Sequence, residues 1–322
     1  MHPRNPYINP PDFASLADAY PALKTQLMRL ANNIFTIDFK NELSQRCLTE
    51  ALLHRDFNLT IAVPDDRLCP PVPNRLNYIL WLQDILSATA LITSDSEAQN
   101  LLGIDIGTGS SAIYPLLGCQ SDQRWAFIAT DVDEKSLDFA RRNVQTNLLD
   151  SRISVVKSDP TGPILLRVLQ DDTLLPQGVD SFSFTMCNPP FYSSREEILR
   201  SAEAKEFEPT AVCTGADVEM ITPGGESAFV CRIVRESLEA RTRCRWYTSM
   251  LGKMSSLSEV VTLLRESRID NYACTEFVQG QTRRWAVAWS FDDVRLPDSL
   301  ARTHSPALQS IMPPRNTRHK AN

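Results

Sequence analysis

The sequence is poor in the residue patterns that bind metal ions or form disulfide frameworks. Its eight cysteines are scattered without a Cys-x-x-Cys pair, and it has only four histidines. We therefore expect no metal site, and we interpret most cysteines as small core residues of a protein in a reducing compartment. No apolar run approaches the roughly 20 residues that a membrane-spanning helix needs. Residues 1–13 have no apolar core, so no secretory signal is expected.

Charge is distributed unevenly along the 322 residues. The net charge of −6 by itself disfavours binding to nucleic acid. However, residues 228–290 carry ten basic and six acidic side chains, and residues 299–322 carry four basic and no acidic side chains. Because binding depends on the local electrostatic field, the C-terminal part can still present a basic face to a nucleic acid.

The N-terminal part of the chain has a helical pattern. Residues 1–12 are polar and rich in proline, and we expect an arm rather than a packed element. Residues 13–91 form a helical extension, with apolar spacing that predicts helices at 14–30, 41–57 and 75–91 and a short strand at 59–63.

Strands and helices alternate from residue 101 onward. Strands are predicted at 101–106, 126–132, 152–159, 180–187, 244–251, 272–278 and 285–291, and the main helices at 133–148, 164–170, 226–242 and 255–267. This order predicts an α/β fold with a doubly wound, mostly parallel sheet, and the last two strands can pair as an antiparallel edge.

Two polar segments interrupt or follow this pattern. The stretch 193–224 is too long for an ordinary connection, so we expect a functional, flexible loop. Residues 293–322 are rich in Pro, Ser and Arg, and they predict a disordered tail.

The segment Asn188-Pro189-Pro190-Phe191 is the most informative motif. It follows an apolar run that predicts a buried strand, and two consecutive prolines cannot continue such a strand. The Asn188 amide oxygen and the neighbouring backbone carbonyl then offer two acceptors, and Phe191 offers a flat apolar surface. Such a site suits a planar substrate with an amino group, either adenine, cytosine or guanine, or a glutamine amide.

A glycine turn predicts the cofactor site. Gly107 and Gly109 follow Asp105 at the end of the strand 101–106, and Asp131 ends the next strand, where an acidic residue can hold a ribose diol. These features suit a dinucleotide or S-adenosylmethionine, since both contain adenosine. The position of Asp105, the Asn-Pro-Pro-Phe motif and the antiparallel strand pair favour S-adenosylmethionine.

These parts combine into a methyl-transfer hypothesis. Asn188 Oδ1 and the Pro189 carbonyl would accept the two N–H bonds of an exocyclic amine, so that its lone pair faces the methyl group. Phe191 would stack on the base, which must first leave its own stack in the nucleic acid. No strong base is needed before attack, and alignment alone can contribute about 7–11 kcal/mol.

Seven motifs, two of which contain the glycine turn and the Asn-Pro-Pro-Phe segment, indicate a resemblance to a known family. They are PPDFASLA, RLNYILW, GIDIGTG, ATDVDE, MCNPPF, GGESAFVCRI and TEFVQGQTRRWAVAWSF. Over residues 2–292 the chain resembles the U6 small nuclear RNA N6-adenosine methyltransferases, a family that also methylates hairpins of an S-adenosylmethionine synthetase transcript. The resemblance implies a Rossmann-like class I S-adenosylmethionine-dependent methyltransferase domain at 92–292, with residues 13–91 as an RNA-binding extension.

The resemblance also implies roles for individual residues. Cofactor contacts are implied for Arg75, Gly107, Asp131, Asn188 and, in the loop 158–163, Thr161. An RNA groove is implied for Arg4, Lys40, the stretch 193–216, Lys253, Gln279, Arg283, Arg284 and Trp285. The chain departs from the family at Met254 and Gln281, where lysine and arginine are usual, and at Asp131, where glutamate occurs. The loop 158–163 holds no lysine, whereas the family's loop does.

Three rivals to adenosine N6-methylation in structured RNA remain open at the sequence level. They are a ribosomal RNA adenine methyltransferase, a protein glutamine-amide methyltransferase, which shares the Asn-Pro-Pro motif, and a non-catalytic RNA-binding module. The basic residues after 228 disfavour a protein substrate, and the intact glycine turn with Asp131 and Asn188 disfavours an inactive module. The basic segment PRNTRHK predicts a nuclear protein, with the cytoplasm as a second location.

Overall fold

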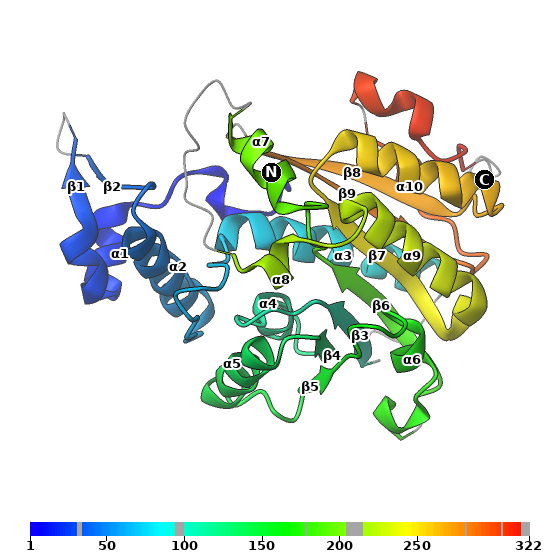
Figure 1. The fold of residues 1–322 in the computed structure, drawn as a ribbon, viewed down its shortest axis with the longest axis horizontal. Helices are drawn as coiled ribbons and strands as arrows, with labels where there is room; N and C mark the ends of the chain where they lie inside the picture. The colour runs from blue at the N-terminus through cyan, green and yellow to red at the C-terminus, as the bar shows by residue number, and fades with distance from the viewer. Residues whose placement is uncertain are drawn as a thin grey trace.

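A seven-stranded sheet forms the centre of the computed structural model, which describes residues 1–30, 34–93, 100–177, 179–203, 215–280, 282–303 and 305–316 (Figure 1). The strand order is β5-β4-β3-β6-β7-β9-β8. The strands are β3 (Leu101–Ile106), β4 (Trp125–Asp131), β5 (Ile153–Lys157), β6 (Phe182–Cys187), β7 (Cys244–Leu251), β8 (Tyr272–Gln279) and β9 (Thr282–Trp289).

The sheet is parallel except around β9. This strand runs antiparallel to β7 on one side and to β8 on the other, so β8 and β9 form a hairpin at the sheet edge. The predicted antiparallel pair is therefore confirmed, although the reversed strand is the second from the edge. This order of strands agrees with the predicted doubly wound, mostly parallel sheet.

Helices cover both faces of the sheet and enclose two apolar cores. One core includes buried residues of α3 (Val72–Thr93), α4 (Ile113–Ser121) and α5 (Glu134–Thr146). The other includes residues of α6 (Leu166–Leu169), α9 (Gly225–Ala240) and α10 (Met254–Glu266). The centre of the first core is aromatic, because Trp125 and Phe127 from β4 pack on Phe184 from β6. The distances between the ring centres are 4.8 Å for Trp125 and 5.5 Å for Phe127. No helix among the described residues is long and apolar enough to cross a membrane.

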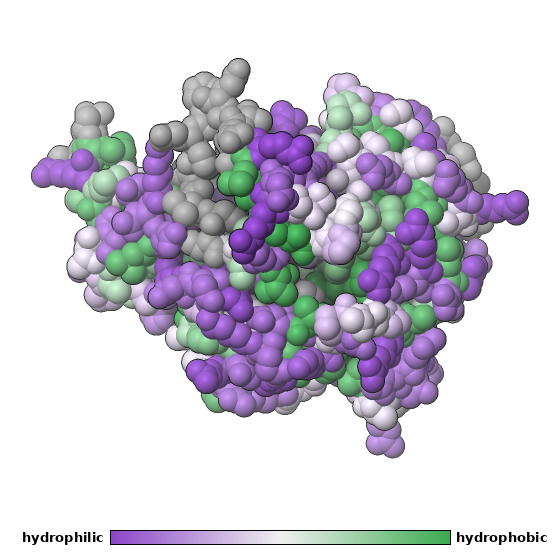
Figure 2. All heavy atoms as spheres, viewed as in Figure 1, coloured by the Kyte–Doolittle hydropathy of each residue, from purple (hydrophilic) through white to green (hydrophobic). Residues whose placement is uncertain are grey.

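The N-terminal extension contains more than helices. Helix α1 (Phe13–Ala19) ends before Pro21, because the residue before a proline is disfavoured in the helical region. A 3-10 turn, η2 (Pro21–Gln26), and a hairpin of β1 (Leu27–Arg29) and β2 (Phe35–Ile37) replace the rest of the helix predicted at 14–30. Figure 2 shows apolar atoms exposed on this hairpin, where Met28, Leu30 and Ile34 are accessible. Helix α2 (Glu42–Phe57) agrees with the prediction.

The strand predicted at 59–63 does not form. The backbone N–H groups of Thr60 and Ala62 donate instead to the side chains of Asn147 and Asn143, at 2.9 and 2.7 Å. Side-chain amides on α5 thus replace a partner strand, which the alternating apolar pattern alone could not indicate.

The start of the chain, expected to be an unpacked arm, is anchored through three buried residues, His2, Asn5 and Tyr7. The short turn η1 (Pro6–Ile8) buries Tyr7, and Asn5 donates to Asn77 Oδ1 at 2.8 Å. The His2 backbone N–H donates to the same oxygen at 2.8 Å, and the Met1 amino group donates to the Val278 carbonyl at 2.6 Å. The proline-rich composition suggested solvation, but a few polar anchors fix the segment against α3 and β8.

The loop and the tail also contain regular structure. Helices α7 (Arg195–Glu203) and α8 (Asp217–Met220) occupy the ends of the stretch 193–224, and residues 204–214 lie outside the described residues. The tail contains α11 (Asp298–Ala301) and η6 (Pro306–Ile311), and it buries Leu308 and Met312. Disorder was expected for 293–322, whereas the described residues of this tail include helical turns; residues 304 and 317–322 lie outside the described part.

Candidate active site

A cavity of about 380 Å³ lies at the carboxyl ends of β3, β4 and β6. This is where open α/β sheets bind ligands. Gly107 (φ 72°) and Gly109 (φ 64°) line it and turn the chain from β3 toward α4 in a backbone conformation that side chains disfavour. The Gly109 N–H donates to Asp131 Oδ2 at 2.8 Å, which ties the turn to the end of β4.

Asp131 lies where a ribose-binding carboxylate is expected. It lines the cavity, and its second oxygen accepts the Asp133 N–H at 3.0 Å. Burial raises the pKa of Asp131, while these backbone hydrogen bonds oppose the shift. Each carboxylate oxygen has a second lone-pair direction, so the side chain can still accept hydroxyl groups of a ligand.

Several buried polar atoms around the cavity have no hydrogen-bond partner within the described part of the chain. They belong to Asp105, Thr108, Ser110 and Asn188. Unpaired buried polar groups are costly and call for an explanation such as an absent ligand. Thr108, Ser110 and Asn188 line the cavity, where a polar ligand could pair with them, and the buried Asp105 lies close behind the lining residues Ile106 and Gly107, so these residues fit S-adenosylmethionine.

Asp105 is fully buried beneath the glycine turn. Burial raises its pKa to about 7, and the charge of Asp131 adds to this effect, whereas Thr108 and Arg75 oppose it. A cation in the cavity would favour the ionised carboxylate.

Helix α3 places Arg75 in the wall of the same cavity. Its guanidinium lies 5.6 Å from the ring centre of Tyr114, a residue of α4 that also lines the cavity. The N-terminal extension therefore contributes to the wall of this cavity. The sequence identified Arg75 through the resemblance but gave no signal for Tyr114.

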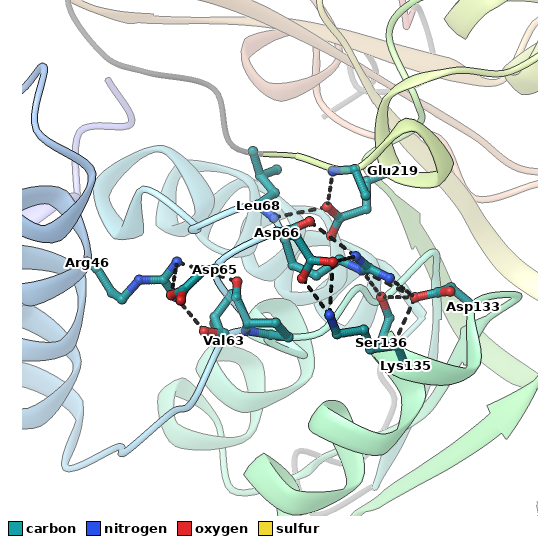
Figure 3. A network of polar contacts seen from close by, with 12 residues as sticks. Arg46, Val63, Asp65, Asp66, Leu68, Asp133, Lys135, Ser136 and Glu219 are labelled. Carbon is teal, nitrogen blue, oxygen red and sulfur yellow. Dashed lines mark hydrogen bonds and ion pairs between the residues drawn. The ribbon is translucent and has the colours of Figure 1, made fainter.

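A polar network joins the segment before α3 to α5 and α8 beside the cavity, and Figure 3 shows its contacts. Arg67, in the connection before α3, pairs with Asp133 at 2.8 Å and with Asp66 at 2.8 Å. Glu219 of α8 accepts the Leu68 N–H at 2.9 Å and the Ala216 N–H at 3.1 Å. Both Leu68 and Glu219 line the cavity, so the segment after 214 reaches over the cofactor site. The sequence analysis missed this contact because it joins residues about 150 positions apart.

Thr161 lies beside the cavity rather than in its lining. Asp159, Pro160 and Gly162 line the cavity, whereas the Thr161 hydroxyl donates to Asp159 Oδ1 at 2.8 Å. The loop that the resemblance implicates is therefore at the site.

The Asn-Pro-Pro-Phe segment separates the cofactor cavity from a second, open pocket of about 520 Å³. Asn188, Pro189 and Pro190 line the first, and Phe191 lines the second. Gly252 is required at this point, because a β-carbon there would lie 2.9 Å from Phe191 Cδ1. Glu226, buried at the start of α9, accepts the N–H groups of Gly252 and Lys253 at 2.6 and 2.8 Å. It thereby fixes the turn beside Phe191.

The predicted RNA contacts fall into two groups. Close to Phe191, the Arg284 guanidinium lies 5.3 Å from the ring centre, and Lys253 lines the open pocket. Lys253 Nζ pairs with Glu197 of α7 at 2.5 Å. Desolvation lowers the pKa of Arg284, and the charge of Arg75 adds to this effect.

The other predicted RNA contacts lie elsewhere on the chain. Gln279 and Trp285 lie on the β8–β9 hairpin, and each has a buried polar atom without a partner among the described residues. Arg283 is exposed and pairs with Glu276 at 3.1 Å. Arg4 contacts Asp84 of α3, and Lys40 is exposed just before α2. Gln281 and part of the stretch 193–216 lie outside the described residues.

Comparison with known proteins places this arrangement in a family. A family model described as RNA methyltransferase matches residues 1–293. The chain belongs to this RNA methyltransferase family. It is 42% identical over 279 residues to the U6 small nuclear RNA (adenine-(43)-N(6))-methyltransferase of Schizosaccharomyces pombe, covering 86% of this chain and 68% of the relative. It is 42% identical over 302 residues to the human RNA N(6)-adenosine-methyltransferase METTL16, covering 92% of this chain and 52% of the relative.

Solved structures of family members agree with the fold. The catalytic domain of human METTL16 in complex with MAT2A 3′UTR hairpin 1 matches with a TM-score of 0.81 at 41% identity, over 92% of this chain and 98% of that one. The N-terminal domain of human METTL16 in complex with SAH matches with a TM-score of 0.73 at 40% identity. The match covers 91% of this chain and 99% of that one. The chain spans about half to two thirds of the length of the curated relatives that it matches.

Proposed function

We propose that this chain transfers a methyl group from S-adenosylmethionine to N6 of an adenosine in structured RNA. One observation carries the proposal. The Asn188 amide oxygen is buried without a partner among the described residues, at the boundary between the cofactor cavity and the pocket beside Phe191. An acceptor in this position suits the amino group of a base that approaches a bound cofactor.

The relatives support both the cofactor and the substrate class. A 40% identical human domain was solved with SAH, and a 41% identical one with an RNA hairpin. The Schizosaccharomyces pombe relative is named for adenine 43 of U6 small nuclear RNA. We therefore propose U6 small nuclear RNA as the first substrate, and a hairpin of an S-adenosylmethionine synthetase pre-mRNA as the second.

The chain's own residues would hold the cofactor and orient the base. When bound, S-adenosylmethionine supplies an electrophilic methyl group on a sulfonium. Asp131 would hold the ribose hydroxyls. Arg75 would bind the carboxylate of the methionine part. Asp105, buried next to the glycine turn, would balance the positive charge of the sulfonium. The Asn188 amide oxygen and the Pro189 carbonyl would accept the two amino hydrogens of adenine, while Phe191 stacks on its ring. Orientation of this kind accounts for much of the rate enhancement in such reactions.

The RNA would approach from the side of the open pocket. Arg284 and Lys253 lie next to Phe191, where they can bind phosphates flanking an extruded adenosine. The exposed Arg283 and Lys40 would extend this groove. We propose that the protein acts in the nucleus, because the basic segment PRNTRHK is typical of nuclear-import signals.

The proposal is tested by methylation with isotopically labelled S-adenosylmethionine. U6 transcript, the synthetase hairpin, ribosomal RNA and a pool of cellular proteins would each be incubated with the enzyme, digested and analysed by mass spectrometry. We expect labelled N6-methyladenosine at a single position of U6. If only ribosomal RNA were labelled, ribosomal RNA rather than U6 would be the substrate. Label in protein glutamine would overturn the proposal.

A further inference from the structure

The sheet opens next to the catalytic segment, between β6 and β7. Backbone pairing between these strands runs from Phe182 opposite Cys244 to Phe184 opposite Trp246 and then stops. On its other side, β6 stays paired with β3 up to Cys187, which lies opposite Ile106. The last three residues of β6 therefore have a regular partner strand on one side only, and Asn188 follows directly.

Side chains replace the missing backbone pairs in this opening. The Thr248 N–H donates to Thr185 Oγ1 at 3.1 Å, and the Thr248 hydroxyl donates to the Thr185 carbonyl at 2.7 Å. The Tyr78 hydroxyl, from α3, lies 2.5 Å from Thr248 Oγ1. The Cys187 N–H donates to the Tyr78 hydroxyl oxygen at 3.3 Å.

The direction of these hydrogen bonds follows from counting protons. Thr248 has one hydroxyl proton, which it gives to the Thr185 carbonyl, so its oxygen must accept from Tyr78. Tyr78 then donates its own proton and accepts the Cys187 N–H. Burial raises the pKa of Tyr78 well above its ordinary value, so the hydroxyl keeps the proton that this order needs.

We propose that Tyr78 is a positioning residue for the Asn-Pro-Pro-Phe segment. Its hydroxyl lies in the opening between β6 and β7 and binds the N–H of the Met186–Cys187 peptide, one residue before Asn188. This inference rests on the proposed function, because it assigns to α3 the task of fixing the acceptor that orients the amino group. Tyr78 itself does not line the cofactor cavity, so it acts through the backbone of Cys187 and Asn188.

The surroundings make Tyr78 rigid enough for this task. The ring is fully buried and meets Tyr114 edge-on at 5.6 Å, and the neighbouring Asn77 anchors the first residues of the chain. A hydroxyl on a buried helix places the strand end more accurately than a mobile loop could. Loss of the hydroxyl would leave the Cys187 N–H without its acceptor and would allow Asn188 to shift, and a displacement near 1 Å can cost about 100-fold in rate.

The test compares Tyr78→Phe with Tyr247→Phe in the full chain. Tyr247 is a suitable control, because its ring is equally buried and its hydroxyl donates to a backbone carbonyl, that of Arg241, at 2.6 Å. For Tyr78→Phe we expect kcat on U6 transcript to fall at least about tenfold, with the Kd for cofactor and the Kd for RNA within about twofold. Amide hydrogen exchange at Cys187 should become faster. Tyr247→Phe should keep kcat within about twofold and leave exchange at Cys187 unchanged.

A second pair of variants keeps the test decisive if Tyr78→Phe folds poorly. Thr248→Ser retains the hydroxyl and should retain kcat, whereas Thr248→Val removes it and should lower kcat. An unchanged kcat in Tyr78→Phe, or a lower kcat with unchanged exchange at Cys187, would overturn the assignment. Failure of the wild-type protein to methylate any RNA would instead refute the proposed function, and the exchange experiment would still report on the Tyr78 contact.

Discussion

At the scale of single residues, the active site contains titratable groups that burial removes from water. Asp105 shows this most clearly, because its carboxyl group is fully buried and burial raises its pKa. Its position two residues before Gly107 was enough to suggest a role at the cofactor. Its altered protonation depends on how deeply the turn covers it, and sequence spacing does not contain that information.

The protonation of Asp105 predicts a pH dependence of stability. The pKa is raised from an ordinary value of 3.8 to about 7, so the folded state holds this proton more tightly than the unfolded state. The stabilisation is complete below about pH 4 and is lost as pH rises through 7. Asparagine mimics the protonated side chain at every pH. Urea unfolding without cofactor measures the free energy of unfolding of Asp105→Asn and of the wild type. The value for Asp105→Asn minus the value for the wild type should increase by roughly 2–3 kcal/mol between pH 5 and pH 8. A constant difference would contradict the assignment.

At the scale of elements, most strands and helices of the sheet domain follow from hydrophobic periodicity. β3 and β7 end at the predicted residues, and α5, α9 and α10 lie within two residues of their predicted ends. The errors occur where side chains determine the backbone. Asn143 and Asn147 replace a strand partner for 59–63, and Pro21 ends α1 early. The contact of Glu219 with Leu68 and that of Tyr78 with Cys187 join distant segments, and no local pattern predicts such contacts.

The contact between α7 and the turn before α10 predicts two opposite effects on RNA binding. Hydrogen bonds from Lys253 and Ser193 lower the pKa of Glu197 to about 2, so the Glu197 carboxylate is ionised at neutral pH. An RNA phosphate must compete with Glu197 for Lys253. Lys253→Glu should weaken RNA binding about tenfold at low salt, whereas Glu197→Gln should strengthen it up to about fivefold, the upper range for an exposed ion pair.

Filter binding at several salt concentrations measures both changes. Arg141→Glu is the matched control, since Arg141 also pairs with a carboxylate, that of Asp138 at 3.2 Å, but lies on α5 outside the open pocket and the cofactor cavity. The Kd for cofactor should stay within about twofold in all three variants. Weaker RNA binding in Glu197→Gln would show that the ion pair supports the groove instead of competing with it.

At the scale of the whole molecule, both termini stabilise the sheet edge. The amino group of Met1 binds the carbonyl of Val278 on β8, and the tail contacts β8 and α10 through Tyr272 and Arg265. The family model matches residues 1–293, so the tail lies after the matched region. The composition of the tail predicted disorder because its apolar residues are few and separated by prolines. Their burial depends on a surface that α10 provides.

Removal of the tail should lower stability more than activity. Truncation after 293 removes the buried side chains of Leu308 and Met312, each worth about 1.5–3 kcal/mol before the cost of ordering the segment. We expect the Tm to fall by several degrees, measured by calorimetry, while methyl transfer at 20 °C is retained. Truncation after 316 is the comparison, because it keeps Leu308 and Met312, and its Tm should lie above that of the protein truncated after 293. An equal Tm in both truncated proteins would show that the tail contributes nothing to the fold.

The most direct test of the account is single-turnover methyl transfer by Asn188 variants on U6 transcript. The account predicts that Asn188→Ala loses at least about 100-fold in rate, because the amino group of adenine is no longer oriented, while the Kd for RNA stays within about threefold. Asn188→Asp keeps an oxygen acceptor and should retain more activity than Asn188→Ala. A single-turnover rate for Asn188→Ala equal to that of the wild type would contradict the account.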